Sequence, residues 1–178
     1  MLAFTRLRGT LGGIALLSLE NERKIQAFAE VPQTLQIHAS FSPDGRWLAY
    51  MSTELNGIPQ VFAQPHPTTG AKFQITTRGG EYPHWSADGK QLFYEFLGKL
   101  FVVDVQTEST FSAGPPSELP ITGALNPVPG LRNYDVTKDG RFLVVLPAPG
   151  NAGGQSSAAQ INVILNWLEE LKQRVPLQ

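Results

Sequence analysis

The sequence predicts an all-β protein of repeated antiparallel units, and the main reason is a segment that occurs three times. The copies are FSPDGRWLAYMS from Phe41, HWSADGKQLFYEF from His84 and YDVTKDGRFLVVL from Tyr134. Their Asp-Gly pairs begin at Asp44, Asp88 and Asp139, so the period is 44 and then 51 residues. Asp-Gly between two strand-like runs is a strong hairpin signal, because glycine accepts the positive φ of a tight turn. A period of this length is typical of repeat architectures.

Composition restricts the function classes. The 178 residues carry a net charge of −1, with 42% hydrophobic and 16% charged residues. This length can form one domain with a substantial core. The charge balance argues against a nucleic-acid partner. The absence of cysteine excludes disulfides, thiolate chemistry and Cys-ligated zinc, and leaves the compartment open.

The N-terminal apolar run LGGIALLSL follows Arg6 and Arg8, an order that is typical of a targeting segment. The charged run ENERK then separates it from the small residues Ala27–Ala29, which is unlike a signal peptide. The run also has about half of the roughly 20 residues that cross a bilayer. The sequence therefore predicts a hairpin of strands 14–19 and 24–28, and no membrane span.

Each full unit is predicted to contain four short antiparallel strands. In the first unit these strands are LQIHASF, RWLAYMS, PQVFAQPH and KFQIT, the last over 72–76. In the second unit they are EYPHWS, KQLFYEF, KLFVVDV and a fourth strand near 118–122, beyond a proline-containing loop. Four strands in about 44 residues match one propeller blade.

The predicted units cover about 13–29, 35–78, 81–122 and 131–166 of a single domain, 1–178. LRNYDVT and RFLVVLP supply two strands of the last unit, and INVILNW from Ile161 supplies one more. The spacing of Leu168, Leu171 and Val175 then changes to a helical period, which predicts a short helix over 166–175.

The repeated segments resemble the TolB-type, WD-like β-propeller repeat, whose blades read W-S-P-D-G, a hydrophobic strand, and an outer strand ending in L-T. FSPDGRWLAYMS and HWSADGKQLFYEF match this pattern well, whereas the third copy has Lys138 where proline is usual. INVILNWLEELKQRVP also resembles the end of bacterial serine/threonine-kinase-like proteins that carry such a propeller. The resemblance covers about 13–176 and implies the fold. No kinase motif is present, so kinase activity is not implied.

A propeller usually closes with four to eight blades, whereas this chain offers two full and two partial units. The sequence therefore predicts a partial propeller, an open arc cut from a longer propeller or encoded by a shortened gene. Open blade edges and apolar faces favour self-association.

Three residues occupy the position two before the Ser or Thr of each turn, namely Ser40, His84 and Asp135. If the inner strands line a channel, these residues lie at the same depth on neighbouring blades. Ser, His and Asp invite a hydrolase hypothesis, but channel-lining positions are commonly polar. No glycine elbow surrounds Ser40. The sequence therefore predicts no catalytic site.

The remaining candidates have structural interpretations. His38, His66 and His84 lack close ligand spacing, so we expect no metal site. The turn aspartates Asp44, Asp88 and Asp139 are expected to bind their own backbone rather than calcium. Aromatic residues on predicted strands are expected to pack between blades rather than stack on a ligand; these are Phe41, Trp47, Tyr50, Trp85, Phe93, Tyr94 and Phe101.

We interpret the chain as a non-catalytic protein- or peptide-binding or scaffolding module that needs no cofactor. Its loops 53–59, 113–117 and 147–160 would present the binding surface. The resemblance implies the sensor or interaction end of a larger bacterial propeller protein, by analogy of fold. Two alternatives stay open: the propeller cap of a prolyl-oligopeptidase-like hydrolase without its catalytic domain, and a gene fragment without independent function. Genomic context would separate these interpretations.

Overall fold

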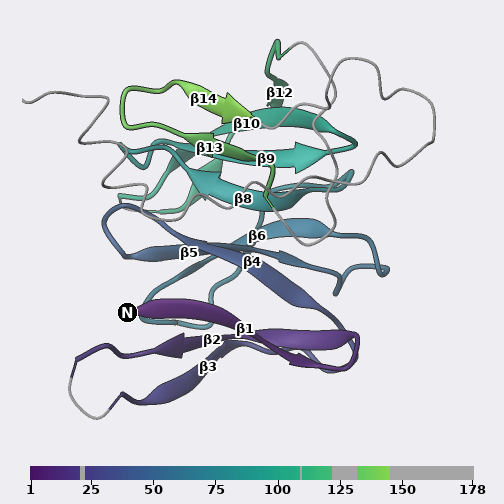
Figure 1. The fold of residues 1–178 in the computed structure, drawn as a ribbon, viewed down its shortest axis with the longest axis vertical. Helices are drawn as coiled ribbons and strands as arrows, with labels where there is room; N and C mark the ends of the chain where they lie inside the picture. The colour runs from purple at the N-terminus through teal and green to yellow at the C-terminus, as the bar shows by residue number, and fades with distance from the viewer. Residues whose placement is uncertain (21–22, 109, 122–131, 145–178) are drawn as a thin grey trace, which may run out of the picture. The chain divides into compact units, whose positions relative to one another are not determined.

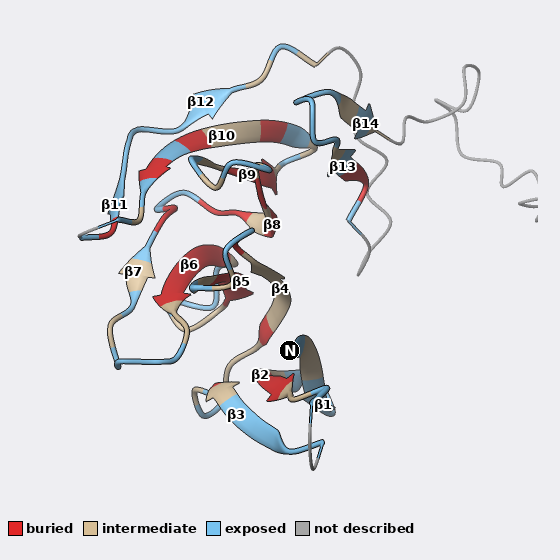
Figure 2. Cartoon of the chain, turned by 90° about the vertical axis from the view of Figure 1, so that its left-hand side faces the viewer, coloured by how far each residue is buried: buried red, intermediate tan, exposed pale blue. Residues whose placement is uncertain are grey.

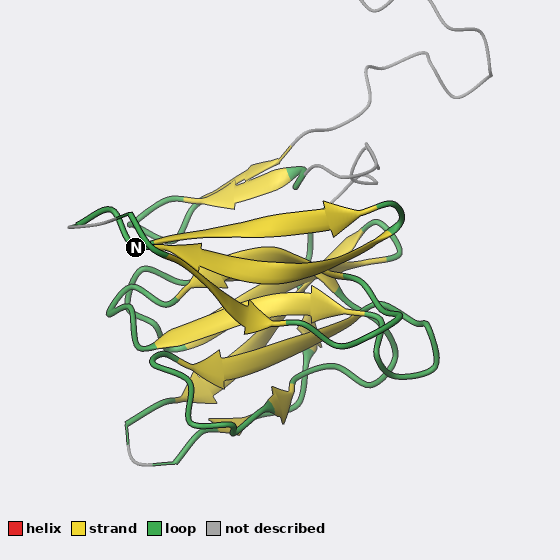
Figure 3. Cartoon of the chain, turned by 90° about the horizontal axis from the view of Figure 1, so that it is seen from below, coloured by secondary structure: helices red, strands yellow, loops and turns green. Residues whose placement is uncertain are grey.

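Strands form all the regular structure of the described residues, and Figure 3 shows no helix among them. The computed structural model describes residues 1–20, 23–108, 110–121 and 132–144, which belong to the unit Met1–Pro147. In this part of the chain no helix is long and apolar enough to cross a membrane. The prediction of an all-β fold is confirmed. The predicted strand from Ile161, the helix over 166–175 and the loop 147–160 lie outside the described residues.

The strands form four antiparallel sheets in chain order (Figure 1). The first sheet contains β1 (Leu2–Arg8), β2 (Leu11–Leu17) and β3 (Ile25–Ala29). The second contains β4 (Gln36–Phe41), β5 (Trp47–Ser52), β6 (Gln60–Pro65) and β7 (Phe73–Gln74). The third contains β8 (Glu81–Trp85), β9 (Gln91–Phe96), β10 (Lys99–Gln106), β11 (Ser112–Ala113) and β12 (Ser117–Glu118). The fourth pairs β13 (Tyr134–Val136) with β14 (Phe142–Val144).

The repeated turn is held by a hydroxyl and a carboxylate. The Ser42 hydroxyl accepts the N–H of Trp47 at 2.9 Å and donates to Oδ1 of Asp44 at 2.6 Å. That carboxylate also accepts the N–H of Arg46 at 3.0 Å, and Gly45 follows it with φ of 71°. Ser86 and Asp88 repeat the arrangement in the next sheet, and Thr137 and Asp139 repeat its hydroxyl bonds. The turn aspartates therefore serve the local backbone, as the sequence predicts.

Both complete inner strands contain a bulge at the same repeat position. The pairing of β4 with β5 shifts between Ile37 and Ser40, and that of β8 with β9 shifts between Glu81 and His84. His38 and Tyr82 lie in these bulges with φ of 59° and 52°, and their rings stack at 4.0 Å. The two bulges thus bring the rings of His38 and Tyr82, from neighbouring inner strands, into contact.

Three hydrophobic clusters join each sheet to the next. The first contains residues of β2, β5 and β6, the second residues of β5, β6, β9 and β10, and the third residues of β8, β9, β10 and β13. Figure 2 shows buried positions concentrated in β2, β6 and parts of β8 to β10, whereas β3 and β12 are largely exposed. The aromatic residues of the predicted strands all belong to these clusters or pack against them; they are Phe41, Trp47, Tyr50, Trp85, Phe93, Tyr94 and Phe101.

Two strands differ from expectation. The structure adds β1, which pairs along β2 from Leu2–Leu17 to Arg8–Leu11, where the sequence predicted only a hairpin of two strands. The outer strand of the third sheet begins earlier than predicted and is split into β11 and β12. Pro115 and Pro116 lie between the two pieces, and proline has no N–H to donate to the strand ladder.

A hydrogen bond from Trp85 ties the second and third sheets together. Its indole N–H donates to the Ser40 carbonyl at 3.0 Å, and the side chain is buried. We expect Trp85→Phe to lower the free energy of unfolding by about 0.5–1.5 kcal/mol, because it removes the hydrogen bond to this part-buried carbonyl. Chemical denaturation followed by circular dichroism measures this. Trp47→Phe, which removes no hydrogen bond that the described residues show, is the control. Equal losses in both variants would contradict a role for the indole bond.

Candidate binding pocket

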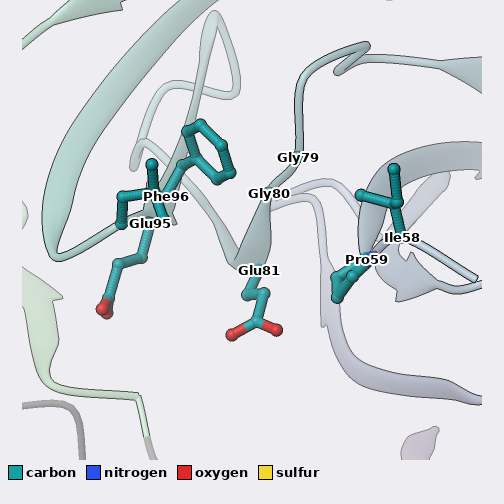
Figure 4. A pocket seen from close by; sticks show the side chains of 8 residues that line it. Ile58, Pro59, Gly79, Gly80, Glu81, Glu95 and Phe96 are labelled. Carbon is teal, nitrogen blue, oxygen red and sulfur yellow. The ribbon is translucent and has the colours of Figure 1, made fainter.

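A pocket of about 270 Å³ opens where the second and third sheets meet (Figure 4). The connection between β5 and β6 and the two-residue turn between β9 and β10 form part of its wall. Its lining residues are Ile58, Pro59, Gly79, Gly80, Glu81, Glu95, Phe96 and Leu97. The predicted binding loop 53–59 thus contributes two residues, while loop 113–117 lies elsewhere as an exposed segment between β11 and β12.

Two glycines let the chain pass close to the aromatic wall. Gly79 has φ of 134°, and a Cβ atom there would overlap the ring of Phe96. A Cβ on Gly80 would lie 3.0 Å from Cγ2 of Thr76 and 3.1 Å from Cδ2 of Tyr94. No sequence motif marks this Gly-Gly pair as part of a site, yet side chains at these positions would clash with the wall of the pocket.

Two carboxylates come from neighbouring strands. Glu81 of β8 and Glu95 of β9 are paired Cα to Cα, and Figure 4 shows their side chains extending in the same direction. Glu95 is only 6% exposed, and its Oε2 has no hydrogen-bond partner in the described part of the chain. Burial raises the pKa of both carboxyls, and the charge on Glu81 raises that of Glu95 further. The pair therefore resists double ionisation.

The rim of the pocket is apolar. Ile58 and Leu97 are 47% and 83% exposed. Leu97 has φ of 51°, a conformation that favours glycine or asparagine over leucine. The connection of the preceding sheet has Asn56 at a φ of 57° before Gly57, as that conformation prefers. The leucine is thus held outward in the turn at some cost in backbone energy.

A second polar group lies on the inner strands. His84 and Asp135, which the sequence places at equivalent repeat positions, approach to 3.4 Å between Nε2 and Oδ1. Arg132 lies 2.6 Å from Nδ1 of His84 and 3.1 Å from Oδ1 of Asp135. Burial and the Arg132 charge lower the pKa of His84, whereas Asp135 acts in the opposite direction. The sequence analysis did not identify Arg132.

This arrangement differs from that of a catalytic triad. Arginine can only donate, so Nδ1 of His84 accepts, and the neutral ring carries its proton on Nε2, toward Asp135. A triad needs the carboxylate at one nitrogen and the other nitrogen free to accept from the nucleophile. The Ser40 hydroxyl forms no hydrogen bond with His84 among the described residues, and the Ser40 carbonyl binds Trp85.

The other histidines lie apart from this group. Nδ1 of His66 lies 3.2 Å from the Gly45 carbonyl, and its ring packs against Phe41. Burial lowers the pKa of His38 to about 4, and its Nδ1 is unpartnered in the described region. No group of three or more His, Asp or Glu side chains that could hold a metal ion occurs in the residues that the structure describes.

A wider hollow of about 690 Å³ lies between the Asp-Gly turns of the second and third sheets. Its charged residues include Asp44 and Arg46, which bind each other at 2.6 Å, and Asp88, whose carboxylate accepts from the turn. Each of these groups is thus bound within its own turn. Lys90, Asp104 and Glu108 also line the hollow, and they are exposed to solvent, unlike the buried carboxylate of Glu95.

Comparison with known proteins places the fold. No protein-family model and no curated protein matches this chain. A solved structure assigned as TolB from Agrobacterium tumefaciens is similar, with 16% identity and a TM-score of 0.51 over 65% of this chain and 43% of that one. TolB from Acinetobacter baumannii has 21% identity and a TM-score of 0.47, over 79% and 38% of the two chains. The β-propeller domain of the Trilobed protease from Pyrococcus furiosus has 16% identity and a TM-score of 0.43, over 67% and 44%.

The described sheets are therefore blades of a TolB-like β-propeller, as the repeated segments predict. The chain spans less than half of the length of each of these structures. At such identities the similarity concerns the fold.

Gly79 offers a test of the pocket wall. We expect Gly79→Ala to lower the free energy of unfolding by about 2 kcal/mol or more, since it adds a clash with Phe96 to an unfavourable φ. Gly70→Ala is the control, because Gly70 has φ of 85° with open space around it. Thermal unfolding compares the two. A loss in Gly79→Ala no larger than in the control would show that Phe96 moves aside freely.

Glu95 makes stability depend on pH. Its pKa lies above the usual 4.5 in the folded protein, so the folded state binds the proton more tightly and loses stability as pH rises through the folded pKa. At pH values above that pKa, we expect Glu95→Gln to raise Tm by about 2–4 °C. This is the effect of about 1 kcal/mol in a domain of this size. The gain should vanish below pH 4.5. Thermal unfolding from pH 4 to 8 measures it, with exposed Glu20→Gln as control; a gain that persists at pH 4 would contradict the charge effect.

Proposed function

We propose that this protein is a non-catalytic module that binds a protein or peptide, and that the pocket beside Leu97 is its binding site. The observation that carries the proposal is the apolar rim. Ile58 and Leu97 flank the same pocket, and Leu97 occupies a backbone conformation that suits asparagine better. Backbone strain of this kind persists where the exposed side chain has a use.

The polar group on the inner strands supports a non-catalytic role. Nδ1 of His84 accepts a hydrogen bond from Arg132, whereas in a catalytic triad this nitrogen donates to a carboxylate. Its lowered pKa favours the neutral ring, which suits a structural bridge between β8 and β13. We further propose that the chain forms the interaction end of a longer bacterial propeller protein. The similarity to a TolB-like structure of which the chain covers 43% supports this proposal.

Leu97 gives the sharpest test. We expect Leu97→Asn to raise the free energy of unfolding by about 0.5–1 kcal/mol, because asparagine tolerates a positive φ. It should weaken binding at least fivefold, because the rim loses its most exposed apolar side chain. Peptides selected from a displayed random library against the purified chain serve as probes, and isothermal titration gives their Kd.

Two controls make the outcome decisive. Leu7→Asn changes a leucine that is 65% exposed on β1, away from the pocket. It should leave Kd unchanged. Selected peptides that bind wild type, Leu97→Asn and Leu7→Asn equally would overturn the pocket as the binding site, and a library that yields no binding peptide would overturn the proposed function.

A further inference from the structure

We propose that the pocket recognises a cationic side chain of a peptide, lysine or arginine, and that Glu81 and Glu95 are its counter-ions. This inference rests on the proposed function and specifies the chemistry of the ligand. It follows from four observations: the pairing of the two carboxylates, the absence of an ion pair to either of them among the described residues, the residues at the same positions in the preceding blade, and the size and rim of the pocket.

The pairing concentrates negative charge at one point. Glu81 and Glu95 stand directly opposite each other on antiparallel strands, where like charges destabilise a sheet. The structure shows no ion pair for either carboxylate among the described residues. Oε2 of Glu95 is a buried acceptor without a donor. A buried, unsatisfied carboxylate is costly, and a donor cation supplied by a ligand would relieve that cost.

The preceding blade shows that the fold does not need these carboxylates. Counted from the turn serines Ser42 and Ser86, Glu81 corresponds to Ile37 and Glu95 to Met51. Ile37 and Met51 are likewise paired across β4 and β5, and Met51 is 3% exposed, close to the 6% of Glu95. The same architecture therefore accepts an apolar pair. The carboxylates of the third blade are best explained by a ligand.

The volume and lining of the pocket suit one long basic side chain. Its volume of about 270 Å³ is below the range of about 300–1,000 Å³ typical of sites for drug-sized ligands. Ile58, Phe96 and Leu97 contribute apolar surface to the pocket that the two carboxylates also line. Lysine and arginine combine an apolar stem with a charged end, so the stem would lie along the rim while the end pairs with Glu81 and Glu95.

An inorganic cation fits less well. Calcium takes six to eight oxygen ligands, and magnesium requires a near-ideal octahedron. The described residues contain no group of three or more His, Asp or Glu that could hold a metal. Two carboxylates beside an apolar rim match an organic cation better.

Capped pentapeptides test the inference without an identified partner. The probes are acetyl-Gly-Leu-X-Leu-Gly-amide with X as lysine, arginine, norleucine or glutamate, titrated at low salt and pH 7.5 and followed by NMR of the isotope-labelled chain. We expect the lysine or arginine peptide to bind at least tenfold more tightly than the norleucine peptide, as charge-assisted hydrogen bonds imply. The glutamate peptide should bind most weakly.

Variants separate the charge from the pocket itself. Glu95→Gln and Glu81→Gln should each abolish the tenfold preference for lysine and arginine, measured as the ratio of the Kd of the norleucine peptide to that of the lysine or arginine peptide. Glu20→Gln, an exposed carboxylate outside the pocket, should change neither. If Glu95→Gln disturbs folding, Glu95→Met tests the same point, because Met51 fills the corresponding position of the preceding blade.

The outcomes distinguish this inference from the proposed function. Equal binding of the norleucine and lysine peptides, lost in Leu97→Asn, would overturn the cation site and leave peptide binding in place. No shift of pocket resonances with any probe would count against both. Calcium chloride alone shifting the resonances of Glu81 and Glu95, with no preference among peptides, would reassign the carboxylates to a metal. An uncapped norleucine peptide that binds as tightly as the capped lysine peptide would assign the cation to an amino terminus instead.

Discussion

The second and third sheets of this protein each have two apolar faces, and the neighbouring sheets cover these faces. In β5, Leu48 and Tyr50 pack toward the first sheet and Ala49 toward the third. In β9, Leu92 and Tyr94 pack toward the second sheet and Phe93 toward the fourth. Side chains alternate along a strand, so a strand that is apolar at consecutive positions has apolar side chains on both faces of its sheet. Each face then needs another sheet packed against it. Face-to-face stacking of blades follows from this requirement.

The stacked blades leave more room for polar side chains at the ends of their strands than in the middle. In the middle of the sheets, alternation and burial leave little room for polar groups. At the ends, turns and bulges break the pattern, and polar side chains gather there: His84 with Arg132 and Asp135, and Glu81 with Glu95. The first group is internally satisfied and joins two blades. The second is not satisfied by described residues and borders an open apolar rim, which is why binding is assigned there.

Equivalent positions of the second and third blades differ in residue type at a few places, and these differences point to function. Where the second and third blades share a residue type, as at the turn hydroxyl and carboxylate, the reason is local backbone chemistry. Where they differ at equal burial, as at Met51 and Glu95, the fold tolerates both and the difference needs another cause. Asn56 and Leu97, which each precede the glycine of a turn, likewise differ in residue type at similar φ, 57° and 51°. Both departures border one pocket, since Glu95 and Leu97 line it together.

The sequence by itself determined the local features. The Asp-Gly turns, the strand alternation and the repeat period follow from rules that act over a few residues, and they were enough to predict an all-β, TolB-like propeller. The strand β1 was missed because LAFTRLR carries no turn motif of the repeat, and the split of the outer strand depends on where two prolines meet β10. Only the tertiary structure placed Arg132 against His84 and put Ile58 of one blade in the same pocket as Glu95 of the next. Such contacts join residues that are tens of positions apart, and their geometry depends on how whole sheets pack, which no local pattern specifies.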